Sequence, residues 1–290
     1  MLVGPLPPLE PYLIAAAIEL GIAAAPSTIA AKIAQHGRRM ERFVEALIAI
    51  GLLDAAGAAW RGPTTIAPPP PSGWGRLAEA IVVDRPVDDG EASAHPGYLD
   101  VLATWAAAPA AALAEALAAR ELPSGPIVDL GGGHGVYGAT LAARLGRHSV
   151  LVDRPAILEL VKQLDGRVAS QPLDLVAASD WPLPRAAVVL LCNVLHLYDL
   201  ATGNELVARA ARLLKPGGLL VVRELVVDDD RRGPLRSVLF ALNMALSTRG
   251  GDVRPAATLV TALGAAGLFG LETWPIDGEA ESRFFVGRRA

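Results

Sequence analysis

Several polar residues of this 290-residue chain stand where short apolar runs end, and their types suit acid–base chemistry. After Pro126 such runs alternate with helical patterns, which predicts βαβ units and a mostly parallel sheet. Ligands of such sheets bind beyond the carboxyl ends of the strands, so the residues found there are candidates for a site. They are Asp129, Asp153, Asp174, Asn193, His196 and Glu224. Together they predict an acidic rim that carries one imidazole.

A glycine-rich loop, residues 131–135 (GGGHG), directly follows the first apolar run and opens a helical pattern. Glycines let a backbone approach a ligand without interference from Cβ atoms. Asp153 follows Gly131 by 22 positions, about the separation at which an acid at the end of the next strand meets a ribose. The loop and the acid together predict a site for a nucleoside cofactor.

Two cofactors match this loop. Gly133, Gly135 and Gly138 also satisfy the GxGxxG pattern of dinucleotide sites, so an NAD-dependent enzyme is one alternative. Asp129, however, stands just before the glycines, where its charge would repel a pyrophosphate and attract an ammonium and a sulfonium. The sequence therefore favours S-adenosylmethionine.

Methyl transfer from a sulfonium is an in-line displacement, so the protein must align the acceptor and remove its proton. His196 is the candidate base, and Glu224 is the carboxylate that would favour its imidazolium form. Cys192 reads as a small buried residue rather than a nucleophile, and the histidines show no metal-ligand spacing. His95 is a weaker candidate for the pocket.

The elements that must position these residues follow from periodicity. Strands are predicted at 126–130, 148–153, 168–173, 186–192 and 219–224. A helix at 256–266 then precedes strands at 268–275 and 283–288, which predict an antiparallel hairpin at the end of the sheet. A helix at 98–119 leads into this α/β domain, to which we assign residues 101–290.

Residues 1–100 are predicted to form a helical domain and a linker. The segment 9–25 is apolar around most of its circumference, and the helical patterns at 28–36 and 39–51 resemble a helix-turn-helix. Arg38, Arg39 and Arg42 keep a DNA-binding regulator as the least favoured alternative. The proline-rich stretch 61–75 is predicted to be a linker or an extended connection.

Composition bounds the partners. The hydrophobic fraction is 52% and the net charge is -4, which gives no global field for attracting phosphate backbones. We therefore expect no nucleic-acid partner. An interrupted N-terminal apolar segment without a basic start predicts no membrane span, and a single cysteine makes the cytoplasm the expected compartment.

Several motifs resemble those of the small-molecule O-methyltransferases, a family that includes plant caffeic acid and bacterial carminomycin-type enzymes. They are VDLGGGHG at 128–135, LVDRP at 151–155, LDL at 173–175, VLH at 194–196, LLKPGGLLVVRE at 213–224 and LNMAL at 242–246. LIAAAIELGI and LIAIGLLD near the N-terminus resemble the family's winged-helix dimerisation domain. The resemblance implies a Rossmann-like class I methyltransferase domain, an all-α winged-helix-like domain and a homodimer.

The resemblance also implies roles for single residues. Asp129, Gly131, Gly132 and Gly133 would hold the methionine end of S-adenosylmethionine, and Asp153 would take the ribose hydroxyls. Asp174 and Leu175 would contact adenine. Further cofactor residues are Arg154, Cys192 and Asn193. His196 and Glu224 would be the catalytic pair. The acceptor, a small aromatic or polycyclic metabolite with a hydroxyl group, would meet Asn243, Met244 and Ser247.

Two positions depart from the family pattern. His196 is followed by Leu197 and Tyr198 where the family usually has Asp and Trp, and Val253 stands where a second orienting Glu is usual. These departures motivate an alternative with the same fold and cofactor. It would carry out N- or C-methylation, or a non-methylating decarboxylation, hydroxylation or rearrangement.

Overall fold

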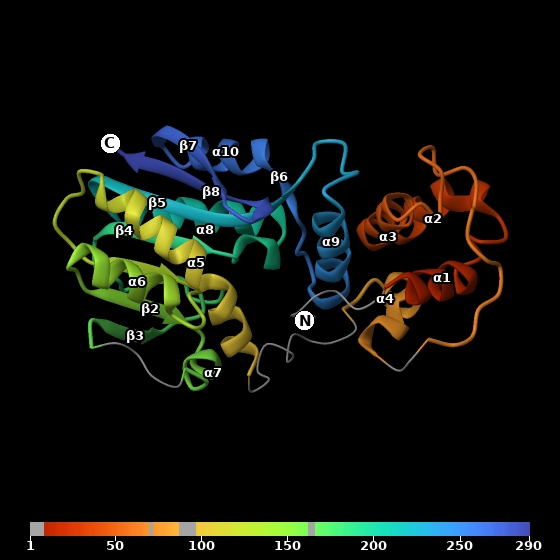
Figure 1. Ribbon diagram of the computed structural model, residues 1–290, viewed down its shortest axis with the longest axis horizontal. Helices are drawn as coiled ribbons and strands as arrows, with labels where there is room; N and C mark the ends of the chain where they lie inside the picture. Colours follow the sequence, from red (N-terminus) through yellow and green to blue (C-terminus); the bar gives the residue numbers. More distant parts are fainter. Residues whose placement is uncertain (1–8, 70–71, 87–96, 162–165) are drawn as a thin grey trace. The chain divides into compact units, whose positions relative to one another are not determined.

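The computed structural model describes residues 9–69, 72–86, 97–161 and 166–290 (Figure 1). The described chain forms two compact units. Of the described residues, unit 1 contains 9–69, 72–86 and 226–255, and unit 2 contains 97–161, 166–225 and 256–290. The chain passes from unit 1 to unit 2 close to the predicted boundary at residue 100, whereas the segment 226–255 returns to unit 1. The predicted functional division into domains stays a prediction, and His95 lies outside the described residues.

Unit 2 is built on a mixed sheet with the strand order β3-β2-β1-β4-β5-β8-β7. The strands are β1 (Ile127–Leu130), β2 (Ser149–Asp153), β3 (Val168–Pro172), β4 (Ala186–Cys192), β5 (Leu214–Val227), β7 (Leu268–Ile276) and β8 (Glu279–Arg289). The first five strands pair in parallel, while β8 is antiparallel to both β5 and β7. The predicted parallel sheet with a C-terminal antiparallel hairpin is therefore confirmed.

The burial of each strand agrees with its place in the sheet. All seven residues of β4 are buried, as expected of a central strand that is covered on both faces. β3 has mostly exposed or half-buried positions and lies at the edge of the sheet. β5 extends beyond the predicted 219–224 in both directions, and its partner β8 continues the ladder past the apolar run to Leu225.

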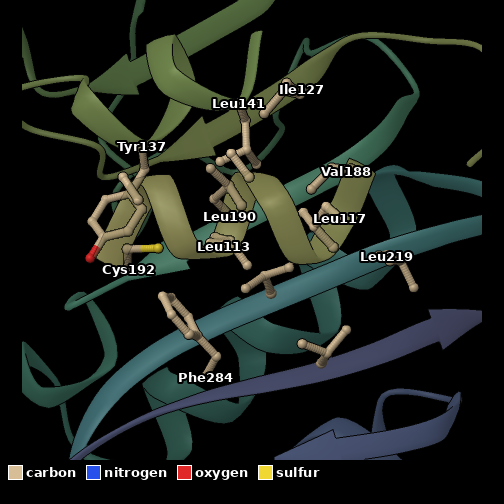
Figure 2. Close-up of a cluster of buried hydrophobic side chains, with 14 of the residues drawn as sticks. Leu113, Leu117, Ile127, Tyr137, Leu141, Val188, Leu190, Cys192, Leu219 and Phe284 are labelled. Carbon is tan, nitrogen blue, oxygen red and sulfur yellow. The ribbon is translucent and has the colours of Figure 1, made fainter. Parts of the chain in front are cut away.

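Helices cover the sheet of unit 2. α5 (Tyr98–Ala118) and α6 (Val136–Leu145) lie on the face nearer the viewer in Figure 1, and α8 (Leu200–Leu213) lies behind the sheet. α10 (Ala256–Ala265) packs on α8 and β7, and the one-turn α7 (Pro155–Leu158) follows β2. Figure 2 shows the core beneath α5 and α6, a hydrophobic cluster that includes Leu113 of α5, Leu141 of α6, Leu190 of β4 and Phe284 of β8.

α5 is the one helix of the described chain whose length and hydropathy would allow a membrane crossing. The same helix contributes Ala106, Ala110, Leu113, Ala114 and Leu117 to the core of unit 2. The apolar side chains of α5 therefore form part of the core of unit 2.

Unit 1 is helical. It contains α1 (Glu10–Glu19), α2 (Ile29–His36), α3 (Arg38–Ala49), α4 (Leu77–Val83) and α9 (Leu235–Ser247), together with the 3-10 turns η1 (Pro26–Thr28) and η2 (Gly73–Arg76). α9 packs on α3 and α4, and the short β6 (Arg254–Pro255) pairs with the last residues of β5. An antiparallel bridge between Leu53 and Trp60 follows α3, which suits a small wing.

The predicted helix at 9–25 is too long. α1 ends at Glu19 because Gly21 adopts a positive φ of 69°, and the N–H groups of Ile22 and Ala23 turn back to the Ala17 carbonyl. The apolar faces of α1 are covered within the chain itself, since Leu13 and Ala17 are fully buried. A partner subunit is not needed for that cover.

Candidate active site

The glycine loop after β1 is tightly built around Asp129. Gly131 and Gly133 adopt positive φ angles of 65° and 51°, which favour glycine. A Cβ on Gly132 would stand 2.5 Å from Leu151 Cδ1 and 2.6 Å from Asp129 Cγ. No larger residue therefore fits at Gly132 without moving its neighbours on β1 or β2.

Asp129 lies beneath this loop and is fully buried. Its Oδ2 accepts the Gly138 N–H at 3.0 Å, whereas its Oδ1 has no hydrogen-bond partner within the described part of the chain. Burial raises the pKa of Asp129 to about 7, and the nearby Asp153 adds to this rise. A cation bound at the loop would stabilise the ionised carboxylate.

Asp153 ends β2 and connects to the same loop. Its Oδ2 accepts the Gly133 N–H at 2.9 Å, and its Oδ1 accepts the Arg154 N–H at 2.8 Å. Burial raises the pKa of Asp153, since the carboxyl is largely removed from solvent. The glycine loop, Asp129 and Asp153 therefore form one connected group, as the sequence predicted for neighbouring strand ends.

The residues predicted to contact adenine follow β3. Asp174 Oδ1 accepts the N–H groups of Val176 and Ala177, both at 2.9 Å, and thereby closes a turn. The Leu175 carbonyl accepts Trp181 Nε1–H at 3.2 Å, and Arg209 lies 4.2 Å above the Trp181 ring. This support was not predicted, because the Arg209–Trp181 contact has no local sequence signal.

Cys192 and Asn193 stand at the end of β4. Burial raises the pKa of the Cys192 thiol well above its usual range, so the thiol stays protonated and is no nucleophile. Asn193 adopts a φ of 59°, donates its N–H to the Arg223 carbonyl at 2.7 Å, and buries an Oδ1 without a partner among the described residues. This kink turns the chain from β4 into η4 (Leu195–Leu197), which carries His196.

His196 and Glu224 form a buried pair. Nδ1 of His196 lies 2.7 Å from Oε2 of Glu224, and their side chains are 7% and 2% exposed. Glu224 Oε1 accepts the N–H groups of Leu195 at 2.6 Å and His196 at 3.3 Å. Because an ionised carboxylate can only accept, this contact favours the tautomer with the proton on Nδ1, which leaves a lone pair on Nε2.

The predicted acceptor residues lie on α9 in unit 1. Met244 is fully buried, Asn243 is 3% exposed, and Ser247 Oγ donates to the Asn243 carbonyl at 2.6 Å. Asn243 Nδ2 has no partner among the described residues. A helix at this position was not predicted, although Leu235, Val238, Leu239, Leu242 and Leu246 repeat with helical spacing after Pro234.

Val253, which stands where a second orienting Glu was expected from the family resemblance, lies in a buried part of unit 1. Val253 is buried, and its neighbour Asp252 accepts Arg231 at 2.9 Å and lies 3.7 Å from Arg42. Asp252 is therefore committed to arginine partners within unit 1. In the described ranges, His, Cys, Asp and Glu side chains form no group of three or more suited to a metal ion.

Comparisons with known proteins point in one direction. A family model described as an O-methyltransferase domain matches residues 109–269. The tetracenomycin polyketide synthesis 8-O-methyltransferase of Streptomyces glaucescens is 29% identical over 280 residues, which cover 84% of this chain and 81% of that protein. The 3-hydroxy-5-methyl-1-naphthoate 3-O-methyltransferase of Streptomyces sahachiroi is 30% identical over 198 residues, or 61% of this chain and 55% of that protein.

The fold has solved counterparts as well. Human N-acetylserotonin methyltransferase, solved in complex with S-adenosylmethionine, matches with a TM-score of 0.63 and 22% identity. The match covers 97% of this chain and 94% of that one. At this identity the likeness establishes a shared fold.

Proposed function

The chain belongs to the family that shares the O-methyltransferase domain, and we propose that it transfers the methyl group of S-adenosylmethionine to a hydroxyl of a small aromatic or polycyclic secondary metabolite. The observation that carries this proposal is the buried His196–Glu224 pair, with Nδ1 and Oε2 2.7 Å apart. It lies in the same unit as the glycine loop. Relatives that act on a tetracenomycin polyketide and on a hydroxynaphthoate support the acceptor class.

The residues around the glycine loop fit S-adenosylmethionine. The buried carboxyl of Asp129 has one oxygen without a partner in the described chain, and burial raises its pKa, so a bound cation would be favourable there. The loop has no room for a side chain at Gly132, and Asp153 supplies acceptors for ribose hydroxyls. When bound, the cofactor supplies a methyl group activated by the positive sulfur. Asp174, Leu175, Arg154, Cys192 and Asn193 complete the proposed cofactor site.

His196 removes the acceptor proton in this proposal. Glu224 holds Nδ1–H, so Nε2 accepts the proton of the hydroxyl while the oxygen forms its bond to the methyl carbon. The carboxylate then stabilises the imidazolium, which later loses its proton to solvent. Asn243, Met244 and Ser247 of α9 are proposed to line the acceptor site.

The test is the substitution His196→Ala, with His148→Ala as its control. His148 is an exposed histidine just before β2 and belongs to the same unit. Formation of S-adenosylhomocysteine from 3-hydroxy-5-methyl-1-naphthoate should fall by about 10²–10⁴-fold in His196→Ala, as for loss of a general base, and stay unchanged in His148→Ala. Full activity of His196→Ala would remove the proposed base.

Product accounting separates the alternative reactions. O-methylation releases one S-adenosylhomocysteine for each methylated oxygen, whereas a non-methylating reaction forms product without consuming the cofactor. Mass spectrometry of the product also distinguishes an oxygen-linked from a carbon- or nitrogen-linked methyl group. Titration calorimetry with S-adenosylmethionine and with NAD tests the cofactor directly.

We further propose a cytoplasmic homodimer. The exposed apolar side chains Val82 and Val83 of α4 support it, since they are 54% and 45% exposed and a second copy could cover them. Light scattering should give twice the monomer mass, and a Val82→Glu, Val83→Glu double variant should shift the protein towards monomer. A monomeric parent protein would contradict this part of the proposal.

A further inference from the structure

The arginines that suggested DNA binding are used inside unit 1. Arg38 donates to the carbonyls of Gly251 and Arg249, and Arg39 donates to the Thr248 carbonyl at 3.0 Å. All three carbonyls belong to residues 248–253, which we call the post-α9 segment because it directly follows α9. Arg39 also pairs with Asp84 at the end of α4.

Two more arginines complete this arrangement. Arg231 donates to the Val253 carbonyl at 2.9 Å and pairs with Asp252 at 2.9 Å. Arg42 and Arg231 both pair with Glu45 of α3, at 2.7 and 3.1 Å. Arg38, Arg39, Arg42 and Arg231 form what we call the arginine clamp. Its partners in the post-α9 segment are the four carbonyls of Thr248, Arg249, Gly251 and Val253 and the carboxylate of Asp252.

The arginine clamp holds the backbone of the post-α9 segment. Arg39 and Arg42 are 3% and 8% exposed, so their charges depend on these partners, because a buried guanidinium without partners is strongly unfavourable. Each guanidinium presents several donors in a rigid plane, which orients a carbonyl more firmly than an ammonium would. The position of the post-α9 segment is therefore defined largely by side chains of α3.

The segment continues directly from the C-terminal turn of α9. Thr248 Oγ1 donates to the Met244 carbonyl at 2.6 Å, and Ser247 Oγ donates to the Asn243 carbonyl at 2.6 Å. The guanidinium of Arg39 at the Thr248 carbonyl also places a positive charge at the negative end of the helix dipole. Hydrogen bonds thus connect the arginine clamp, through the post-α9 segment, to residues 243–247 in the last turn of α9.

We propose that the arginine clamp positions α9 for acceptor binding, so that Arg38 sets the affinity for the acceptor by acting through α9. The proposal rests on the assignment of Asn243, Met244 and Ser247 to the acceptor site under the proposed function. Arg38 is a positioning residue in this scheme, because its contacts are to backbone carbonyls of the protein. The cofactor residues belong to unit 2 and are not part of the clamp.

The experiment compares Arg38→Met, Arg38→Lys and Arg76→Met in the full-length chain. Arg38 is half-buried, so Met preserves its apolar stem while removing both carbonyl contacts. Lys can restore one of them. Arg76 is the matched control, since it lies in the same unit and forms an exposed ion pair with Glu79. Thermal unfolding confirms that each variant is folded.

Acceptor binding is measured by calorimetry with 3-hydroxy-5-methyl-1-naphthoate in the presence of S-adenosylhomocysteine, a complex that cannot turn over. Loss of two hydrogen bonds should weaken probe binding about tenfold in Arg38→Met, with partial recovery in Arg38→Lys and none of this effect in Arg76→Met. The affinity for S-adenosylhomocysteine should be unchanged in all three. Hydrogen exchange at residues 243–253 should accelerate in Arg38→Met, accelerate less in Arg38→Lys, and stay unchanged in Arg76→Met.

The proposal is overturned if Arg38→Met binds the probe as the parent does, or if its affinity for S-adenosylhomocysteine falls as far as that for the probe. A parent protein that binds S-adenosylhomocysteine but not the probe counts against the proposed acceptor class. In that case hydrogen exchange alone tests whether the arginine clamp positions α9. Equal exchange rates at residues 243–253 in Arg38→Met and Arg76→Met then overturn the proposal.

Discussion

Replacing Glu224 by Gln tests the orientation of the base most directly. The substitution keeps the length of the side chain and removes its charge. In the parent, Oε2 meets His196 Nδ1 at 2.7 Å while Oε1 accepts the Leu195 N–H at 2.6 Å. An amide cannot reproduce both contacts, because one of its two ends is a donor.

Either orientation of the introduced amide has a defined consequence. If its oxygen stays with the Leu195 N–H, the NH2 group faces Nδ1 and drives the imidazole proton to Nε2, where it blocks proton acceptance. If the amide is flipped, the NH2 group opposes the buried Leu195 N–H, which should cost about 1–3 kcal/mol of stability. The first orientation is expected, since it leaves no buried donor of this group without an acceptor.

The magnitude follows from the lost contact. A charge-assisted hydrogen bond contributes about 1.5–3 kcal/mol, which corresponds to about 10- to 150-fold in rate. The wrong tautomer adds to this loss, so kcat should fall by about 10²–10⁴-fold. Affinity for S-adenosylmethionine should stay within about twofold, because the hydrogen bonds of Glu224 are to Leu195 and His196 and not to the glycine loop.

The assay measures S-adenosylhomocysteine formation under saturating cofactor and acceptor, with cofactor affinity from calorimetry. Glu115→Gln is the matched control, because Glu115 pairs with Arg144 at an exposed position of the same unit. A kcat of Glu224→Gln within about threefold of the parent would refute the reasoning, because it would show that His196 does not need the Glu224 carboxylate to act as the base.

Three further predictions concern the cofactor loop and the core. Asp129→Asn should weaken binding of S-adenosylmethionine in calorimetry. In denaturant titrations the free energy of unfolding of the parent should fall as the pH rises from about 4 to 7, and this fall should be absent in Asp129→Asn. The sign follows because burial raises the folded-state pKa from 3.8 to about 7, so ionisation above pH 7 destabilises the cofactor-free fold by at most about 4 kcal/mol. Gly132→Ala should lower stability by about 1–3 kcal/mol through its clash with Leu151 and Asp129, and unchanged thermal unfolding would contradict the close packing. Phe285→Ala should lower the free energy of unfolding by about 3–5 kcal/mol because the ring is fully buried, and a loss below about 1 kcal/mol would contradict that burial.

The strands of unit 2, and the positions of the polar residues at their ends, were predictable because their signals are local. Apolar runs, the glycines of the loop, and polar residues at strand ends together indicated a shared edge for Asp129, Asp153 and His196. His196 and Glu224 are 28 positions apart, yet the rule that parallel strands share one carboxyl edge joined them. The hydrogen bond from Gly138 to Asp129 also lies within a single βα unit.

Unit 1 was less predictable because its contacts join distant parts of the chain. Arg38 and Gly251 are 213 positions apart, and Arg231 and Glu45 are 186 apart. Nothing in the spacing of the arginines on α3 distinguishes a DNA-contacting face from a face that binds another segment of the same protein. The end of α1 was mispredicted for a simpler reason, since Gly21 stops a helix that alanines on both sides would otherwise extend.

The return of residues 226–255 to unit 1 has a consequence for synthesis on the ribosome. α3 and α4 leave the ribosome before α9 does, so α9 can pack on them only after the strands β1 to β5 have been made. Until then the apolar surfaces that α9 will cover stay exposed to chaperones and to neighbouring chains. Exchanging N-terminal modules between relatives should accordingly succeed when residues 226–255 are transplanted together with them.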